Sequence, residues 1–233
     1  MNSRKPVRPV DAAGLILLRG RRDAPEILLG RRHAKAAFLP DVYVVPGGRV
    51  DPEDHLPSGF RERLHPLVAE ALSVGNARRP PSAFLRAALR ELHEETGLII
   101  GQRGAGKAGL HPVWRTYAKA GIAPDFSAFD FLLRAITPVG SRRRYNTRFF
   151  LGDGGDAIGA VRGNGELKDL GWRKLADLDR LHIVDVTWAL IRLAVARWRD
   201  RVPVGSEMPK LLIYRSNSLI LRPITGPRGR RRA

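Results

Sequence analysis

The sequence predicts an α/β protein in which a few helices pack on a mixed β-sheet. Many short apolar runs of strand length are separated by turns rich in glycine, proline or arginine, whereas few segments have clear helical periodicity. The chain has 233 residues, of which 43% are hydrophobic and 27% are charged. These proportions are ordinary for a globular protein, and the length is sufficient for one well-buried core.

The predicted strands are apolar runs that end at turns. In chain order they cover residues 12–18, 26–30, 42–45, 98–100, 126–136, 145–151 and 167–175. The first two flank the polar turn at 20–24, which predicts that they pair. Glycine-rich segments at 101–109 and 152–165 are predicted loops. A further hairpin is expected at 211–214 and 219–221, as an addition to the elements that make up the basic fold.

Helices are predicted at residues 83–96, 112–120 and 187–198. The first has the clearest boundaries. Ser82 is its expected N-cap, because a serine hydroxyl accepts a hydrogen bond from the first helical turn. Gly97 is expected to end it, because glycine adopts the positive φ of a C-terminal cap without strain.

The most informative segment closes this helix and reads Arg-Glu-Leu-His-Glu-Glu-Thr-Gly-Leu at residues 90–98. At about 100° per residue, Glu91, Glu94 and Glu95 share a sector away from the apolar face. Three like charges this close repel one another and lower helix stability. A cation would relieve that repulsion, and oxygen ligands favour Mg²⁺ or Mn²⁺. The alternative for this pattern alone is a solvated acidic face, with Arg90 paired to Glu94.

A second segment, residues 44–51, ends an apolar run in a Pro-Gly-Gly turn. Together the two segments resemble the signature of the Nudix hydrolase family: a glycine, an acidic residue, and then Arg-Glu-apolar-x-Glu-Glu-x-Gly-apolar. Residues 90–98 match the last element at every fixed position. The acidic position falls on Asp54, which is not a glutamate. The chain then runs longer than the family pattern before Arg90, so that an insertion is predicted at about 55–81.

The insertion resembles a branch of the family that is related to peroxisomal coenzyme A diphosphatases. Residues 38–48 are similar to the segment that leads into the glycine turn in that branch. Residues 143–150 are similar to its Arg-Tyr/Phe-Asp-Thr-x-Phe-Phe segment, with Asn146 in place of aspartate. The resemblance covers about residues 10–180 and implies a Nudix-type α/β/α sandwich around the mixed sheet. It also implies coenzyme A or acyl-CoA as the substrate, although no coenzyme A motif can be recognised in residues 31–47.

The family resemblance implies a metal-dependent hydrolase. Its substrate would be a nucleoside diphosphate linked to another group, cleaved at the diphosphate bond. Glu91, Glu94 and Glu95 would hold Mg²⁺ or Mn²⁺, and Gly48 would offer its carbonyl to the metal. Arg90 would pair with a glutamate and orient it. The general base differs between relatives and stays unassigned, with Glu91 as one candidate.

Residues outside the motif are further candidates for substrate binding. Arg31, Arg32 and Arg49 flank the glycine turn and are suited to clamping phosphates. Glu166 precedes a predicted strand, where some relatives supply another acid. His93 occupies a variable position of the motif and is expected to face solvent. A purely structural role is the alternative for each of them, since arginine is frequent throughout the chain.

The formal net charge of +18 favours anionic ligands. Residues 1–9 and 226–233 carry seven of these positive charges and no acids, which leaves +11 on the body. Both termini are predicted to be disordered, with a single domain at 10–225 between them. The charge suits a phosphorylated substrate. It also suits a rival reading, a non-catalytic Nudix-fold module that binds nucleotides or RNA, and it equally arises without any function.

The composition excludes some classes of protein. The chain has no cysteine, so that disulfides, thiolate catalysis and thiolate zinc sites are ruled out. No apolar run approaches the roughly 18 residues of a membrane span. We therefore expect a cytoplasmic protein that acts on a small molecule without a membrane. Pairing into a homodimer is left open by the sequence.

Overall fold

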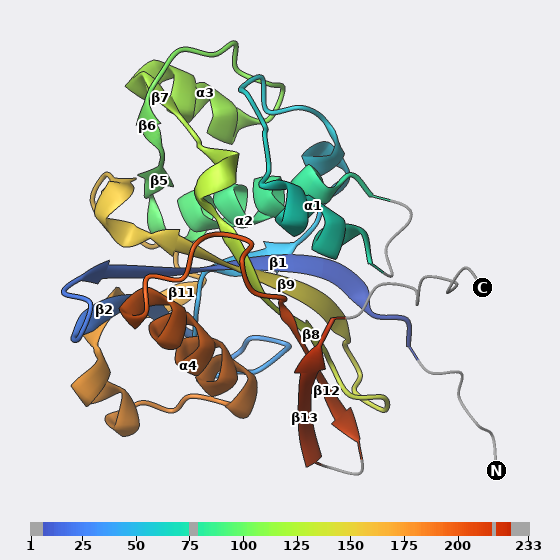
Figure 1. Cartoon of the computed structure of the whole chain (residues 1–233). Coiled ribbons are helices and arrows are strands. Elements are labelled where there is room, and N and C mark those ends of the chain that lie inside the picture. Colours follow the sequence, from blue (N-terminus) through green and yellow to red (C-terminus); the bar gives the residue numbers. More distant parts are fainter. Residues whose placement is uncertain (1–6, 75–78, 216–217, 225–233) are drawn as a thin grey trace, which may run out of the picture.

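The structure is a computed structural model that describes residues 7–74, 79–215 and 218–224 (Figure 1). Most of the basic N-terminal segment predicted at 1–9, and all of the arginine-rich segment predicted at 226–233, lie outside the described residues. Among the described residues, no helix is both long enough and apolar enough to cross a membrane.

The centre of the described part is a mixed sheet of nine strands, in the order β11-β2-β1-β9-β8-β12-β13, with β3 paired to β2 and β4 paired to β1. These strands are β1 (Val10–Gly20), β2 (Pro25–Arg32), β3 (Tyr43–Val44), β4 (Gly47–Arg49), β8 (Asp130–Ile136), β9 (Tyr145–Asp153), β11 (Leu167–Lys174), β12 (Lys210–Arg215) and β13 (Ser218–Pro223). The β1–β2 hairpin is confirmed as an antiparallel pair. In contrast, β1 runs parallel to β9, and β12 runs parallel to β8.

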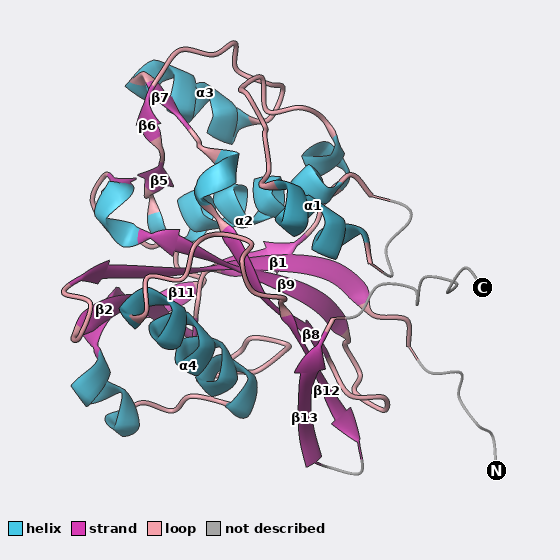
Figure 2. Cartoon of the chain, in the orientation of Figure 1, coloured by secondary structure: helices cyan, strands magenta, loops and turns pink. Residues whose placement is uncertain are grey.

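Helices cover both faces of the sheet (Figures 1 and 2). The helices are α1 (Pro66–Ser73), α2 (Pro81–Thr96), α3 (Pro112–Ala120) and α4 (Asp185–Arg199). α2 packs on one face, next to α1 and α3, and α4 packs on the other. Separate apolar clusters fill the two interfaces, one containing Leu85 and Leu89 of α2, the other containing Leu190 and Ala194 of α4. The predicted α/β/α sandwich is therefore confirmed.

The remaining short elements lie beside α2 and α3. They are the strand pairs β5 (Ile99–Ile100) with β10 (Ala157–Ile158) and β6 (Gln102–Arg103) with β7 (Ile122–Ala123), and the 3₁₀ turns η1 (Pro52–His55), η2 (Phe126–Ala128), η3 (Gly154–Asp156) and η4 (Leu175–Arg180). The strand predicted at 126–136 begins only at Asp130, because η2 occupies its first residues. Within the glycine-rich segment predicted as a loop at 152–165, η3 and β10 are formed.

Two local predictions about α2 have different outcomes. Gly97 ends the helix at φ 74°, as the sequence predicts. The N-cap prediction for Ser82 is wrong, because the helix begins one residue earlier, with Pro80 as the cap and Pro81 as its first residue. Proline is favoured at this first position, where its missing N–H costs nothing. The Ser82 hydroxyl instead accepts a hydrogen bond from Arg86 Nη2 at 3.0 Å.

The C-terminal hairpin is not an appendage to the core. Strand β12 pairs with β8 from Lys210 to Leu212 and so extends the central sheet. Leu212 is fully buried and belongs to the same apolar cluster as α4. The hairpin expected at 211–214 and 219–221 is therefore formed by β12 and β13, and it extends the central sheet through β12.

Candidate active site

The acidic motif forms the last two turns of α2, where the helix passes over β1 and β4. Arg90 and Glu95 are buried, each with 3% of its surface exposed. The side chain of Glu91 is 14% exposed and that of Glu94 is 40% exposed. The motif therefore does not form a solvated helix face, since only Glu94 among these residues is substantially open to water.

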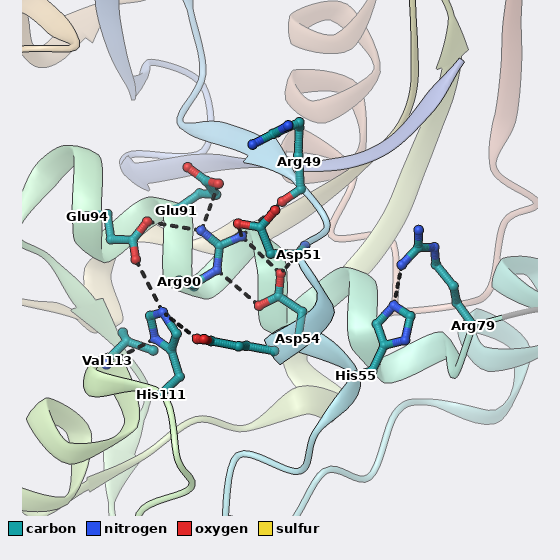
Figure 3. A network of polar contacts seen from close by, with 11 residues as sticks. Arg49, Asp51, Asp54, His55, Arg79, Arg90, Glu91, Glu94, His111 and Val113 are labelled. Atoms are coloured by element: carbon teal, nitrogen blue, oxygen red, sulfur yellow. Dashed lines mark hydrogen bonds and ion pairs between the residues drawn. The ribbon is translucent and has the colours of Figure 1, made fainter. Parts of the chain in front are cut away.

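Arg90 is the centre of an ion-pair network (Figure 3). Its Nε and Nη2 donate to the two carboxylate oxygens of Asp54 at 3.0 and 2.9 Å, a bidentate pair. Its Nη1 donates to Glu91 Oε1 at 2.8 Å and to Glu94 Oε2 at 3.0 Å. Burial by itself lowers the pKa of Arg90, but these three carboxylates outweigh burial and raise the pKa above its ordinary value. Arg90 thus holds two motif glutamates and anchors itself on Asp54.

The glycine turn approaches the glutamates closely because it lacks side chains. A Cβ on Gly48 would lie 2.2 Å from Glu91 Oε1, so that no other residue fits there without displacing that carboxylate. The backbone N–H of Gly47 donates to Glu95 Oε2 at 2.9 Å. Strand β4 holds this turn in place by pairing with β1, Gly47 opposite Gly14 and Gly48 opposite Ala13.

Two of the motif glutamates, Glu91 and Glu95, carry strongly shifted pKa values. Burial raises the pKa of Glu91 to about 7; Arg90 opposes this shift, and the charges of Glu94 and Glu166 add to it. Burial raises the pKa of Glu95 to about 8; the Gly47 N–H opposes the shift, and Glu91 and Glu166 add to it. The glutamates therefore carry more negative charge than the neighbouring donors and cations neutralise. A bound cation would relieve this excess.

Glu166 joins the cluster from a distant part of the chain. It stands directly before β11, and its charge acts on both Glu91 and Glu95. Arg32, at the end of β2, also lies near Glu95 and lowers its pKa. Both residues line the cavity beside the motif. The sequence places Glu166 before a strand, and the structure brings it to the motif.

A cavity of about 650 Å³ lies next to the glutamates and extends along the sheet towards the C-terminal hairpin. Its acidic end is lined by Gly47, Gly48, Arg49, Asp51, Arg90, Glu91, Glu94, Glu95, Glu166 and Arg32. Its other end is lined mainly by apolar and hydroxyl side chains, among them Phe38, Thr137, Ser141, Tyr145, Phe149, Thr187, Leu212 and Tyr214. The rings of Phe38 and Tyr145 meet edge to face at 4.9 Å. The cavity thus offers one charged and one uncharged compartment.

The remaining candidates are placed differently. Arg31 does not line the cavity and pairs instead with Asp41 at 2.8 Å. His93 is half-buried and lines a smaller cavity of about 430 Å³. His111 was not identified from the sequence, yet its Nε2 lies 3.6 Å from Glu94 Oε1. A loop and the start of α3 bring it there, and no local pattern could have signalled the contact.

The donor set fits a hard divalent cation, although the side chains are not arranged as a complete coordination shell. Among the described residues, no three or more His, Asp or Glu side chains stand together in a metal-holding arrangement. Arg90 and the Gly47 N–H occupy one oxygen of each motif glutamate. Nevertheless the acidic donors are carboxylate oxygens, which are the ligands that a hard divalent cation prefers.

Comparison with known proteins identifies similar solved structures. Neither a protein-family model nor a curated protein sequence matches the chain. A Nudix hydrolase from Alicyclobacillus acidocaldarius is 26% identical, with a TM-score of 0.61, over 84% of this chain and 95% of that chain. A MutT Nudix hydrolase from Burkholderia pseudomallei is 18% identical, with a TM-score of 0.47, over 80% and 98% of the two chains. A C. elegans Ap4A hydrolase is also 18% identical, with a TM-score of 0.42, over 80% and 96%. The first of these likenesses establishes a Nudix-type α/β fold.

Proposed function

We propose that the protein is a Mg²⁺- or Mn²⁺-dependent pyrophosphohydrolase of the Nudix type. The observation that carries this proposal is the cluster of Glu91, Glu95 and Glu166 at the charged end of the cavity. Glu95 is buried and Glu91 is half-buried, both have raised pKa values, and burying carboxylates against one another lowers stability unless a cation joins them. A protein without such a ligand would gain stability from replacing them.

The residues would divide the work as follows. Glu91, Glu94 and Glu95 would hold the cation, with the Gly48 backbone beside it. When bound, the cation supplies charge neutralisation for the phosphoryl oxygens and lowers the pKa of a coordinated water. Arg32 and Arg49 line the cavity next to the acids and would bind the diphosphate. Arg90 would keep Glu91 and Glu94 in place through its anchor on Asp54.

The reaction would be attack of water on one phosphorus of the diphosphate. One P–O bond forms, the bridging P–O bond breaks, and two phosphate monoesters leave. A carboxylate must accept the proton of the attacking water. We propose Glu91, the candidate within the motif, and Glu166, the acid outside it, as the candidates for this role; both line the cavity.

Coenzyme A or an acyl-CoA is the finer proposal for the substrate. The segment at 143–150 that resembles the coenzyme A branch forms the start of β9, and Tyr145, Thr147 and Phe149 alternate into the cavity. This placement supports a role for the segment in substrate contact. Hydrolysis of coenzyme A would yield 3′,5′-ADP and phosphopantetheine.

The test is a panel of nucleoside diphosphate derivatives incubated with Mn²⁺ or Mg²⁺, with products separated by chromatography. The panel includes coenzyme A, NADH, nucleotide sugars, ADP-ribose and dinucleoside polyphosphates. We expect hydrolysis of at least one member that stops on addition of EDTA. Turnover of the others without turnover of coenzyme A would remove the finer proposal only.

A Glu95→Gln variant separates the enzyme from a non-catalytic binding module. Glutamine keeps an oxygen that accepts from the Gly47 N–H, so that the fold is retained. The enzyme is expected to lose at least about 100-fold in turnover, the scale of a missing catalytic group. Unchanged nucleotide affinity, together with no hydrolysis by the wild type, would favour the binding module instead.

A further inference from the structure

His111 connects Glu94 to helix α3, although it lies outside the motif that resembles the Nudix signature. It is the N-cap residue of α3, and its Nδ1 accepts a hydrogen bond from the backbone N–H of Val113 at 3.3 Å. A neutral imidazole that accepts at one ring nitrogen carries its hydrogen on the other. The cap therefore places the hydrogen on Nε2.

The Nε2 atom of His111 faces two carboxylates. It lies 3.6 Å from Oε1 of Glu94 and 3.6 Å from Oε2 of Glu53. The other oxygen of Glu94, Oε2, accepts from Arg90 Nη1 at 3.0 Å. Figure 3 shows Glu94 between His111 and Arg90, with each oxygen turned towards a different partner.

Glu94 is the motif glutamate that most needs such support. Its side chain is 40% exposed, and it lines both the 650 Å³ cavity and the neighbouring cavity of about 430 Å³. A glutamate between two open spaces has several rotamers free of clashes. The His111 side chain is only 17% exposed and is fixed by its cap, so that it provides a rigid contact on the side opposite Arg90.

We propose that His111 is a positioning residue for Glu94. Its Nε2–H faces one oxygen of the carboxylate at 3.6 Å while Arg90 donates to the other at 3.0 Å, and together they orient Glu94 for a divalent cation. Side chains that orient a ligand in this way typically change metal affinity by about 10- to 100-fold when removed. The inference rests on the proposed function, in which Glu94 contributes to the cation site. His111 does not line the larger cavity, and it is not expected to touch the substrate.

Two substitutions separate positioning from capping. His111→Asn keeps an N-cap, because the asparagine oxygen accepts from the first turn, but its amide is too short to reach Glu94. His111→Gln keeps an N–H at the reach of Nε2 but is a poor cap. Mn²⁺ binding is measured for the full-length protein by electron paramagnetic resonance of the free ion, and the melting temperature by calorimetry. We expect His111→Asn to weaken Mn²⁺ binding by about 10-fold or more with its melting temperature retained.

His111→Gln should show the reverse, with Mn²⁺ affinity near that of the wild type and a lower melting temperature. His65→Asn is the control, since His65 also stands at the N-cap position of a helix that begins with proline, α1, although its side chain makes no cap hydrogen bond. It should leave Mn²⁺ affinity unchanged. At saturating Mn²⁺, the remaining defect of His111→Asn should fall on kcat while KM for the substrate is unchanged.

Two results would overturn the inference alone. One is wild-type Mn²⁺ affinity in His111→Asn, and the other is a loss of affinity in both variants that follows the loss in melting temperature. A wild-type protein that binds no Mn²⁺ would overturn the proposed function and this inference with it. The two failures are therefore distinguishable.

Discussion

Glu95 is a buried carboxylate that accepts one hydrogen bond, from the Gly47 N–H. Its pKa in the folded protein is raised from 4.5 to about 8, and that of Glu91 is raised from 4.5 to about 7. Between pH 4.5 and about 8, the folded state therefore binds more protons than the unfolded state. The contribution of both groups to stability is present at low pH and is lost as the pH rises through 7 and 8.

In the presence of EDTA, Glu95→Gln should stabilise the protein more at pH 8.5 than at pH 6. Each pKa unit corresponds to about 1.4 kcal/mol, so that the advantage of the variant should grow by at least about 1 kcal/mol over this range. In a chain of this size that is about 2 to 4 °C in melting temperature. Thermal unfolding at the two pH values measures the difference, and an advantage that does not grow with pH would contradict the pKa shifts.

Asp54 is the partner on which Arg90 depends most. Both side chains are almost fully buried, and their pairing is bidentate. Removing one member of a buried pair leaves the other charge uncompensated. We expect Asp54→Asn to lower the free energy of unfolding by about 3 kcal/mol in denaturant titrations.

The matched control for this pair is Asp23→Asn. Asp23 pairs with Arg21 in a similar bidentate manner, but both side chains are exposed to solvent. This change should leave the unfolding midpoint essentially unaltered. Equal effects of Asp54→Asn and Asp23→Asn would mean that Arg90 is not anchored on Asp54.

At the scale of elements, strand β4 delivers the glycine turn to the end of α2. Gly48→Ala tests this approach, because the new Cβ would lie 2.2 Å from Glu91 Oε1 while the φ of Gly48 is one that alanine adopts. We expect a folded protein in which Glu91 is displaced, with Mn²⁺ affinity and turnover reduced by about 10- to 100-fold. Gly171→Ala is the control, since nothing lies near its new Cβ. Equal activity of the two variants would show that the site does not depend on the close approach of Gly48 to Glu91.

The elements themselves were largely predictable where the signal was local. Proline, glycine and apolar periodicity bound α2 and α3 closely, and the Gly97 cap follows from the need for positive φ. The pairing of β12 with β8 was not predictable, because β8 lies far away in the sequence and a hairpin pattern does not reveal which sheet it joins. The same reason explains why Leu212 and Tyr214 were not foreseen as cavity residues.

The site residues divide in the same way, into those with a local sequence signal and those whose contacts depend on the fold. The motif from Arg90 to Glu95 is contiguous, so that the helical period alone groups its acids. The sequence indicates Asp54 as the acidic position of the signature and Glu166 as an acid before a strand, but the contacts of both depend on the fold. His111 reaches Glu94 through a loop with no periodicity, and Arg31, a candidate for phosphate binding, instead pairs with Asp41.

At the scale of the whole molecule, the net charge of +18 is a separate property from the acidic site. We expect RNA to bind nonspecifically, with an affinity that falls steeply as the salt concentration rises. For each phosphate that the protein neutralises, a tenfold rise in salt concentration should lower the binding constant by nearly tenfold. Deleting residues 226–233 removes four arginines and should flatten this dependence. Filter binding over a salt series measures the slope. An unchanged slope would place the RNA contact on the body of the protein.

The proposed chemistry as a whole requires the glutamates of α2 to bind divalent cations. Calorimetric titration of Mn²⁺ into the wild type and into a Glu91→Gln, Glu95→Gln double variant tests this most directly, in two buffers of different ionisation enthalpy at pH 7. We expect binding by the wild type with release of protons, because Glu91 and Glu95 are partly protonated at that pH, and greatly weakened binding by the variant. Equal binding by both proteins, or no binding by either, would contradict the account.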